Sequence, residues 1–366
     1  MFGLSVFYIG SNTLQVVSRT LVLDIIPIEH QHPCALMFIT HSALAKTLAH
    51  FTFFLVNVAT EFESDSQYTA NCIALLILFV VDLILVPVSS FTTFFTATES
   101  YSFSETSIEN KRLSKFMTTV FNTCAGLNRY TLLVWIILFL GWTANLAFEN
   151  SNSELYHIFS ISNDEEYWIN PKAMFELQHL VIALSQLTYC FYMFKRQTYP
   201  WYSMFITNGI SSVTMTLPFV ISLVISFFYE EINKELFVNM SMIFLTVFVV
   251  PVGLNVAQLL SVPFALLKNL VSGEFFGISV GLYNAAIILS KFVVYVVTYF
   301  LFKNYEGSKG NEDLEGNYYI MIATSLTIIL YLITAVASYF FKIVYKYKEP
   351  KSIEQDQSLS TYNPVD

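Results

Sequence analysis

Long apolar stretches constrain this chain more than any other feature of its sequence. A membrane-spanning α-helix needs about 20 consecutive, mostly apolar residues, and the sequence contains nine such stretches. They lie roughly at residues 3–26, 35–58, 70–92, 130–149, 172–194, 201–228, 236–267, 274–302 and 317–342. Because hydrophobic residues make up 55% of the chain and charged residues only 12%, its composition is far from that of a soluble domain. The sequence predicts an all-α integral membrane protein with about nine transmembrane helices.

The rest of the composition argues against several classes of function. The chain has no Gly-rich phosphate loop, no zinc-ligand spacing and no nucleophile motif, so we expect neither an enzyme nor a bound metal or cofactor. Its four cysteines are scattered and are expected to be buried, small apolar residues. The net charge of −9 argues against nucleic-acid binding, which requires basic clusters. The expected surroundings are a lipid bilayer.

Four polar side chains interrupt the first apolar stretch. Asn12, Gln15 and Arg19 are spaced i, i+3 and i+7 and therefore share one helical face, whereas Asp24 follows near the helix end. A charge at membrane depth costs several kcal/mol unless it meets a partner or water. These residues form either a structural ion pair or part of a path for substrate or protons, and we favour the path.

The basic residues of the loops indicate an orientation. Lys and Arg are concentrated in the 93–129 loop and near the C-terminus, whereas the acidic segments 61–67 and 149–170 contain none. Cytoplasmic loops carry an excess of Lys and Arg. We therefore expect a multi-pass protein of the plasma membrane, with the 93–129 loop and the C-terminal tail in the cytoplasm.

The stretches are arranged as three plus six. Residues 1–92 are expected to form a three-helix remnant of an N-terminal bundle, followed by the central cytoplasmic loop 93–129. Residues 130–345 are expected to form a six-helix bundle, and 346–366 a cytoplasmic tail.

Three segments of the chain are "NTLQVVSRTLVLD", "GWTANLAFENSNSELY" and "SVPFALLKNLVSGEFFGISVGLYNAAII". They resemble one branch of the major facilitator superfamily, that of the sucrose transporters and the glycoside–pentoside–hexuronide symporters. "NTLQVVSRTLVLD" resembles the fourth-helix motif N-x-x-Q-x-x-x-R-x-x-x-x-D of this branch. "GWTANLAFENSNSELY" resembles the seventh-helix segment and keeps Trp142, Phe148 and an acid at Glu149. "SVPFALLKNLVSGEFFGISVGLYNAAII" resembles the segment from the tenth to the eleventh helix. Its matching positions are Ser261, Pro263, Phe264, Ala265, Leu266, Gly277, Ser279, Gly281 and Asn284.

The resemblance implies a fold of two six-helix halves and transport by alternating access. It implies proton-coupled symport of a neutral sugar, such as a sucrose-like disaccharide or a glucoside, with important roles for Arg19 and Asp24. It also aligns Met1 with the fourth helix, which predicts three further upstream helices and no transport by the chain as written. Two alternatives stay open, namely a fragment of a longer protein and a non-transporting sensor or partner subunit derived from a transporter.

A neutral sugar is held by fixed polar groups and aromatic faces in a largely apolar site, and a carboxylate beside a cation can exchange a proton. The candidates for the substrate and proton pathway are Asn12, Gln15, Arg19, Asp24, Trp142, Glu149, Asn255, Gln258, Asn284 and Lys291. Asp82 is a further proton candidate. Lys291 departs from the family, which usually has glutamine there.

The second apolar stretch contains polar and small residues at helical spacing. Lys46 and His50 share a face in the second stretch, where they either line a cavity, meet Asp82 or form a structural pair. Ala45 and Ala49 have the small-xxx-small spacing of close helix packing.

The seventh stretch contains Pro251, Gly253 and Pro263. We expect these residues to kink its helix and to expose backbone carbonyls near Asn255 and Gln258.

Overall fold

The computed structural model describes seven segments of the chain and single helical positions between residues 72 and 88. The segments are 31–59, 129–161, 170–195, 200–228, 234–271, 276–305 and 312–346. All regular secondary structure within these residues is helical. The helices are α2 (Gln31–Ala59), α5 (Arg129–Ile161), α6 (Pro171–Lys195), α7 (Pro200–Thr214), α8 (Thr216–Phe228), α9 (Lys234–Phe248), α10 (Val250–Leu270), α11 (Phe276–Tyr305) and α12 (Glu312–Lys346).

Five helical segments are long and apolar enough to cross a membrane. They are Arg129–Phe159, Met204–Ile225, Leu236–Leu267, Gly277–Phe300 and Ile320–Phe341. Four of them coincide with stretches predicted from the sequence. The first continues ten residues beyond the predicted stretch 130–149, so the acidic segment 149–170, which was expected to lie outside the spans, is helical in its first part. Within the described residues the protein is thus confirmed as all-helical and of membrane type. The predicted stretches 35–58 and 172–194 are also helical, as α2 and α6.

Two of the spans are interrupted near their middle, and proline accounts for both interruptions. A proline has no backbone N–H and its ring crowds the preceding turn. Pro218 cannot donate to the Thr214 carbonyl, and the helix is interrupted at Met215, between α7 and α8. Pro251 has the same effect at Val249, between α9 and α10. The kink expected at Pro251 is therefore present, whereas α10 continues through Pro263.

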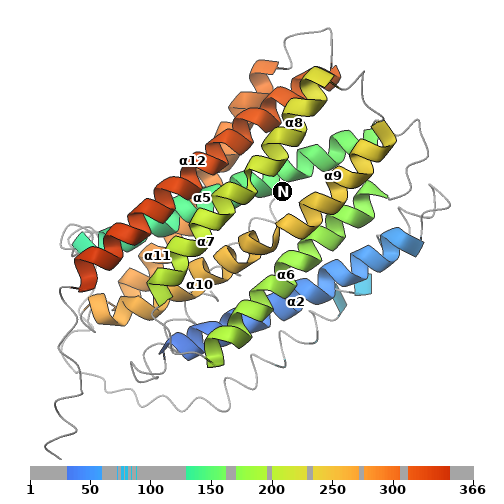
Figure 1. Ribbon diagram of the computed structural model, residues 1–366. Helices are drawn as coiled ribbons and strands as arrows, with labels where there is room; N and C mark the ends of the chain where they lie inside the picture. The colour runs from blue at the N-terminus through green and yellow to red at the C-terminus, as the bar shows by residue number, and fades with distance from the viewer. Residues whose placement is uncertain are drawn as a thin grey trace, which may run out of the picture.

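The packed face of α2 follows a heptad pattern. Leu36, Ala43 and Asn57 are buried and lie seven or fourteen residues apart, with Ile39 on the same face. This face packs on α6 and also on α10, and Figure 1 shows α2 and α6 side by side along one edge of the bundle. Ala45 lies off this face and is exposed. The expectation that the Ala45 and Ala49 spacing forms the packing face is thus wrong for the contact with α6.

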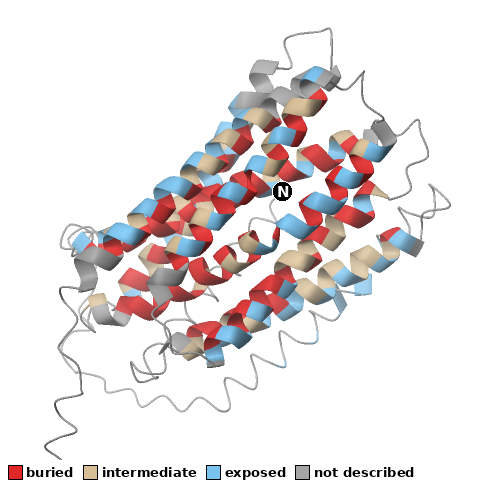
Figure 2. Cartoon of the chain, viewed as in Figure 1, coloured by how far each residue is buried: buried red, intermediate tan, exposed pale blue. Residues whose placement is uncertain are grey.

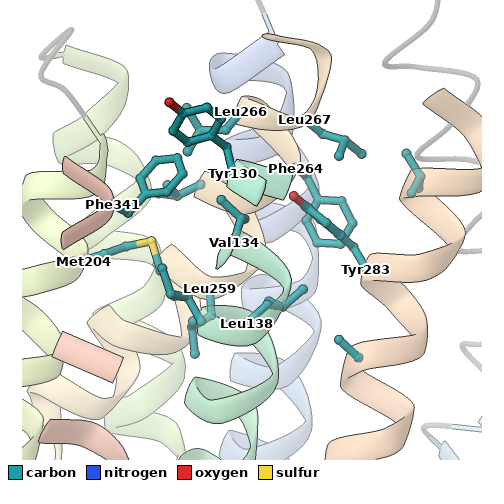
Figure 3. Packing of buried hydrophobic residues seen from close by; sticks show 14 residues of the cluster. Tyr130, Val134, Leu138, Met204, Leu259, Phe264, Leu266, Leu267, Tyr283 and Phe341 are labelled. Carbon is teal, nitrogen blue, oxygen red and sulfur yellow. The ribbon is translucent and has the colours of Figure 1, made fainter. Parts of the chain in front are cut away.

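The largest apolar cluster joins five helices around α5 and α10. Tyr130, Val134 and Leu138 of α5 pack against Leu259 and Phe264 of α10. Side chains from α7, α11 and α12 complete it, namely Met204, Tyr283 and Phe341 (Figure 3). Along the bundle the buried residues line the helix faces that meet one another, and exposed apolar residues cover the outer faces (Figure 2). That distribution suits a protein whose outer surface meets lipid.

Helices α6 and α10 cross at very close range. A Cβ placed on Gly253 would lie 2.5 Å from the Ile182 carbonyl oxygen and 2.7 Å from Cβ of Ser185. Only glycine fits at this crossing, because both obstacles are backbone or directly attached to it. The crossing fixes α10 against α6 and so positions the polar side chains of the two helices.

Candidate functional site

Charged side chains from three helices interact at one level of the bundle. Lys46 on α2, Glu149 on α5 and Lys291 on α11 lie within electrostatic range of one another. Helix α11 is bonded to α5 next to Lys291, because the hydroxyl of Ser290 donates to the Phe139 carbonyl at 2.8 Å. Two cations and one anion from three separate helices therefore converge on the same region, which we call the charge cluster.

Glu149 lies within the apolar segment Arg129–Phe159, and its side chain is exposed. Within the described part of the chain, the carboxylate has no hydrogen bond or ion pair of 4.0 Å or less; its recorded interactions are longer-range ones with Lys46, Lys291 and His50. A carboxylate at the centre of a span costs about 3 kcal/mol. Because the Glu149 side chain is exposed and its interactions with cations are long-range, a ligand or water can reach the carboxylate.

A second polar group lies between α2 and α6. The imidazole of His50 pairs with the Glu176 carboxylate, with 2.8 Å between Nδ1 and Oε2. The ring of His179 lies 4.9 Å from that of His50 between centroids. His50 and Lys46 are on the packed face of α2, so their partners are on α6 and α5. Their expected partner Asp82 lies outside the described residues.

A third, uncharged group connects α5, α10 and α12. The hydroxyl of Tyr331 donates to Oδ1 of Asn145 at 2.5 Å, and Asn255 lies beside the same hydroxyl. All three side chains are buried. Neither amide atom of Asn255 makes a well-formed hydrogen bond within the described structure. Glu149 is also within electrostatic range of Tyr331, which links this group to the charge cluster.

The predicted site residues are therefore brought together only in part. Glu149 and Lys291 converge, and Asn255 is near them through Tyr331. Gln258 instead accepts a hydrogen bond of 2.5 Å from Thr207 on α7. Asn284 donates to the Val280 carbonyl of its own helix.

Trp142 lies two turns before Glu149 on the same side of α5. Its indole N–H is buried and has no hydrogen-bond acceptor within the described structure. The ring packs against the large apolar cluster, which holds it in place. Its N–H is therefore a fixed, buried donor.

The candidates of the first stretch cannot be placed. Asn12, Gln15, Arg19 and Asp24 lie outside the described residues.

Sequence reasoning missed Glu176 and His179, although a signal was present. Their i, i+3 spacing puts two ionisable groups on one side of a predicted span, as Lys46 and His50 are in another. No group of three or more His, Cys, Asp or Glu side chains able to hold a metal occurs among the residues with described positions.

Comparison of the chain with known protein families, with curated proteins and with solved structures finds no match.

We expect Tyr331→Phe to destabilise the bundle. The substitution leaves Oδ1 of Asn145 buried without a donor, and an unsatisfied buried group costs about 1–3 kcal/mol. The thermal unfolding midpoint of the purified protein in detergent should therefore fall. Tyr339→Phe is the matched control, because Tyr339 is on the same helix and exposed, and it should change stability by less than about 0.5 kcal/mol. Equal midpoints for both variants would contradict the role of the hydroxyl.

Proposed function

We propose that this protein is a membrane transporter that moves a neutral sugar together with a proton by alternating access. The charge cluster of Lys46, Glu149 and Lys291 carries the proposal. Ionisable side chains within spans are rare, and they mark substrate and ion pathways. A purely structural cluster would be expected to close into a short ion pair, whereas Glu149 has no partner within 4.0 Å among the described side chains.

The cluster offers suitable groups for a sugar. A carboxylate accepts hydrogen bonds from sugar hydroxyls, an ammonium donates to them, and bonds to charged groups are stronger than neutral ones. Trp142 adds an indole N–H without an acceptor and an aromatic ring on the same side of α5 as Glu149. A small set of placed polar groups among apolar walls is the usual composition of a ligand site.

The interrupted helices support movement during transport. Discontinuous helices are common around transporter substrate sites, and here Met215 and Val249 belong to one apolar cluster with Phe148, the neighbour of Glu149. Ser211 donates to the Pro251 carbonyl at 3.2 Å, so a side chain of α7 is bonded to α10 next to the second interruption. A change in the bend of the helices at Met215 or Val249 would therefore shift α5 and, with it, Glu149 of the charge cluster.

The sequence resemblance extends the proposal to the whole chain. It supports a major facilitator fold of three plus six helices, in the branch of the sucrose transporters. The distribution of Lys and Arg supports a plasma-membrane protein with its central loop and C-terminus in the cytoplasm.

For the parent transporter that the resemblance implies, we expect uptake of radiolabelled sucrose or a glucoside by proteoliposomes to rise when their interior is made alkaline. A proton moving inward down its gradient would then draw the sugar with it. The measurement is initial uptake with and without the pH gradient, with a protonophore as control. Saturable uptake that ignores the gradient would contradict proton coupling, and binding without uptake would contradict transport.

A further inference from the structure

The His50–Glu176 pair joins α2 to α6 across the interface between the two helices. It is the one ion pair of 4.0 Å or less recorded within the described segments. Both side chains are partly accessible, His50 at 27% and Glu176 at 18%. A proton can therefore reach the pair, although both residues lie in stretches predicted to cross the membrane.

The geometry defines where that proton can bind. An ionised carboxylate only accepts hydrogen bonds, so Nδ1 of His50 carries the hydrogen donated to Oε2 of Glu176. This arrangement leaves Nε2 of His50 as the atom that can take up a proton. His179 behaves alike, because its Nδ1 donates to the Phe175 carbonyl at 3.1 Å. Two imidazoles whose Nε2 atoms have no recorded partner among the described residues thus lie side by side, with 4.9 Å between their ring centroids.

The charged surroundings come from three helices. Lys46 precedes His50 by one turn on α2, and Glu149 on α5 is within electrostatic range of both. Lys291 of α11 acts on the pair through its interaction with Glu149. Helix α10 also packs on α2 and α6, but it has no charged residue before Lys268.

We propose that His50 and Glu176 together bind the coupling proton, and that this proton strengthens the contact between α2 and α6. The proposal rests on the transport function proposed above. With a proton on Nε2 the pair is an imidazolium and a carboxylate without net charge. Without that proton the pair carries one net negative charge, which is harder to hold between two helices.

The protonated pair also has the stronger hydrogen bond. Both partners of that bond are ionised, whereas in the unprotonated pair only the carboxylate is, so proton binding adds the attraction between two opposite charges. Helix α2 belongs to the predicted group of three spans and α6 to the predicted group of six. Proton binding would therefore control a contact between the two groups, and such a contact must change when access alternates.

The decisive variant is His50→Gln, which keeps a hydrogen-bond donor but cannot bind the proton. We expect wild-type proteoliposomes, with the membrane potential held at zero, to accumulate sugar about tenfold per unit of pH gradient, the limit for one proton per sugar. In His50→Gln the accumulation ratio should fall to about one, while exchange of labelled for unlabelled sugar continues. A pH-sensitive dye inside the vesicles should show that sugar no longer brings protons in.

His41→Gln is the matched control. His41 lies on the same helix and is exposed, and within the described segments its ring has one recorded hydrogen bond, with the Met37 carbonyl of its own helix at 2.8 Å. This variant should accumulate sugar as the wild type does. Equal loss in His41→Gln and His50→Gln would overturn the assignment, as would normal accumulation by His50→Gln.

A double variant guards against misfolding. In His50→Gln/Glu176→Gln, two amides can hydrogen-bond across the interface without a titratable group. We expect exchange without accumulation here as well, and accumulation by this variant would overturn the proposal. The two proposals fail in different ways. Absence of sugar exchange in the folded wild type would overturn the transport function, whereas accumulation by a variant would overturn only the assignment of the proton site.

Discussion

Glu149→Gln is expected to lower sugar uptake by about one to two orders of magnitude. The substitution removes the carboxylate that faces Lys46 and Lys291 and replaces it with a neutral amide of the same shape. A hydrogen bond to a charged group contributes about 1.5–3 kcal/mol, and each 1.4 kcal/mol is about a factor of ten in rate or affinity. The loss should appear in sugar binding as well as in uptake, because the carboxylate is proposed to contact the substrate.

Glu154→Gln provides the comparison for this variant. Glu154 lies five residues further along α5 and has no recorded interaction with the charge cluster. Its substitution should leave uptake and sugar affinity at wild-type values. Both variants should first be shown to reach the membrane in equal amounts. Wild-type uptake by Glu149→Gln would remove this residue from the substrate site and leave the charge cluster with a structural role.

Gly253→Ala is expected to reduce stability by about 3 kcal/mol, the upper part of the range for overpacking. The new Cβ would stand 2.5 Å from the Ile182 carbonyl oxygen, and a backbone atom cannot move away as a side-chain tip can. Helices α6 and α10 must therefore separate along their crossing. The thermal unfolding midpoint in detergent should fall, and uptake should fall with it, because both helices position polar groups near the charge cluster.

Two other glycines test the same reasoning, because the space for an added methyl group differs at each of them. Gly209→Ala adds a methyl group with nothing within 4 Å, so its unfolding midpoint should match that of the wild type or exceed it. Gly141→Ala meets the tip of Leu259, with 2.7 Å to Cδ2, and this flexible side chain can turn aside. We expect an intermediate loss. A midpoint for Gly253→Ala equal to that for Gly209→Ala would contradict the close crossing.

The helices could be predicted from the sequence because each depends on a local property. Long apolar runs identified the regions of all nine described helices to within a few residues at most ends. The interruption at Val249 followed from Pro251 in the same way, since a missing N–H acts on its own turn. The interruption at Met215 could have been predicted from Pro218 by the same reasoning.

The candidate site could be predicted only in part, because it depends on which helices meet. Glu149 and Lys291 were identified as ionisable groups in apolar stretches. The sequence does not show, however, that α2 brings Lys46 to the same charge cluster. The pairing of His50 with Glu176 spans 126 residues. Ala45 and Ala49 show the reverse case. Small residues permit close packing without selecting it, and the heptad of Leu36, Ala43, His50 and Asn57 selects the face toward α6.

The polar side chains between α2 and α6 affect how the chain enters the membrane. On leaving the translocation channel, α2 alone would present Lys46 and His50 to lipid, and α6 alone would present Glu176 and His179, at a cost of about 3 kcal/mol per charge. Together the two helices shield these groups from the hydrocarbon. Since α6 is synthesised more than 100 residues after α2, we expect α2 to remain at the channel, or with an insertion chaperone, until its partner arrives. Integration of this protein into the bilayer should therefore proceed by pairs of helices and out of the order in which they are translated.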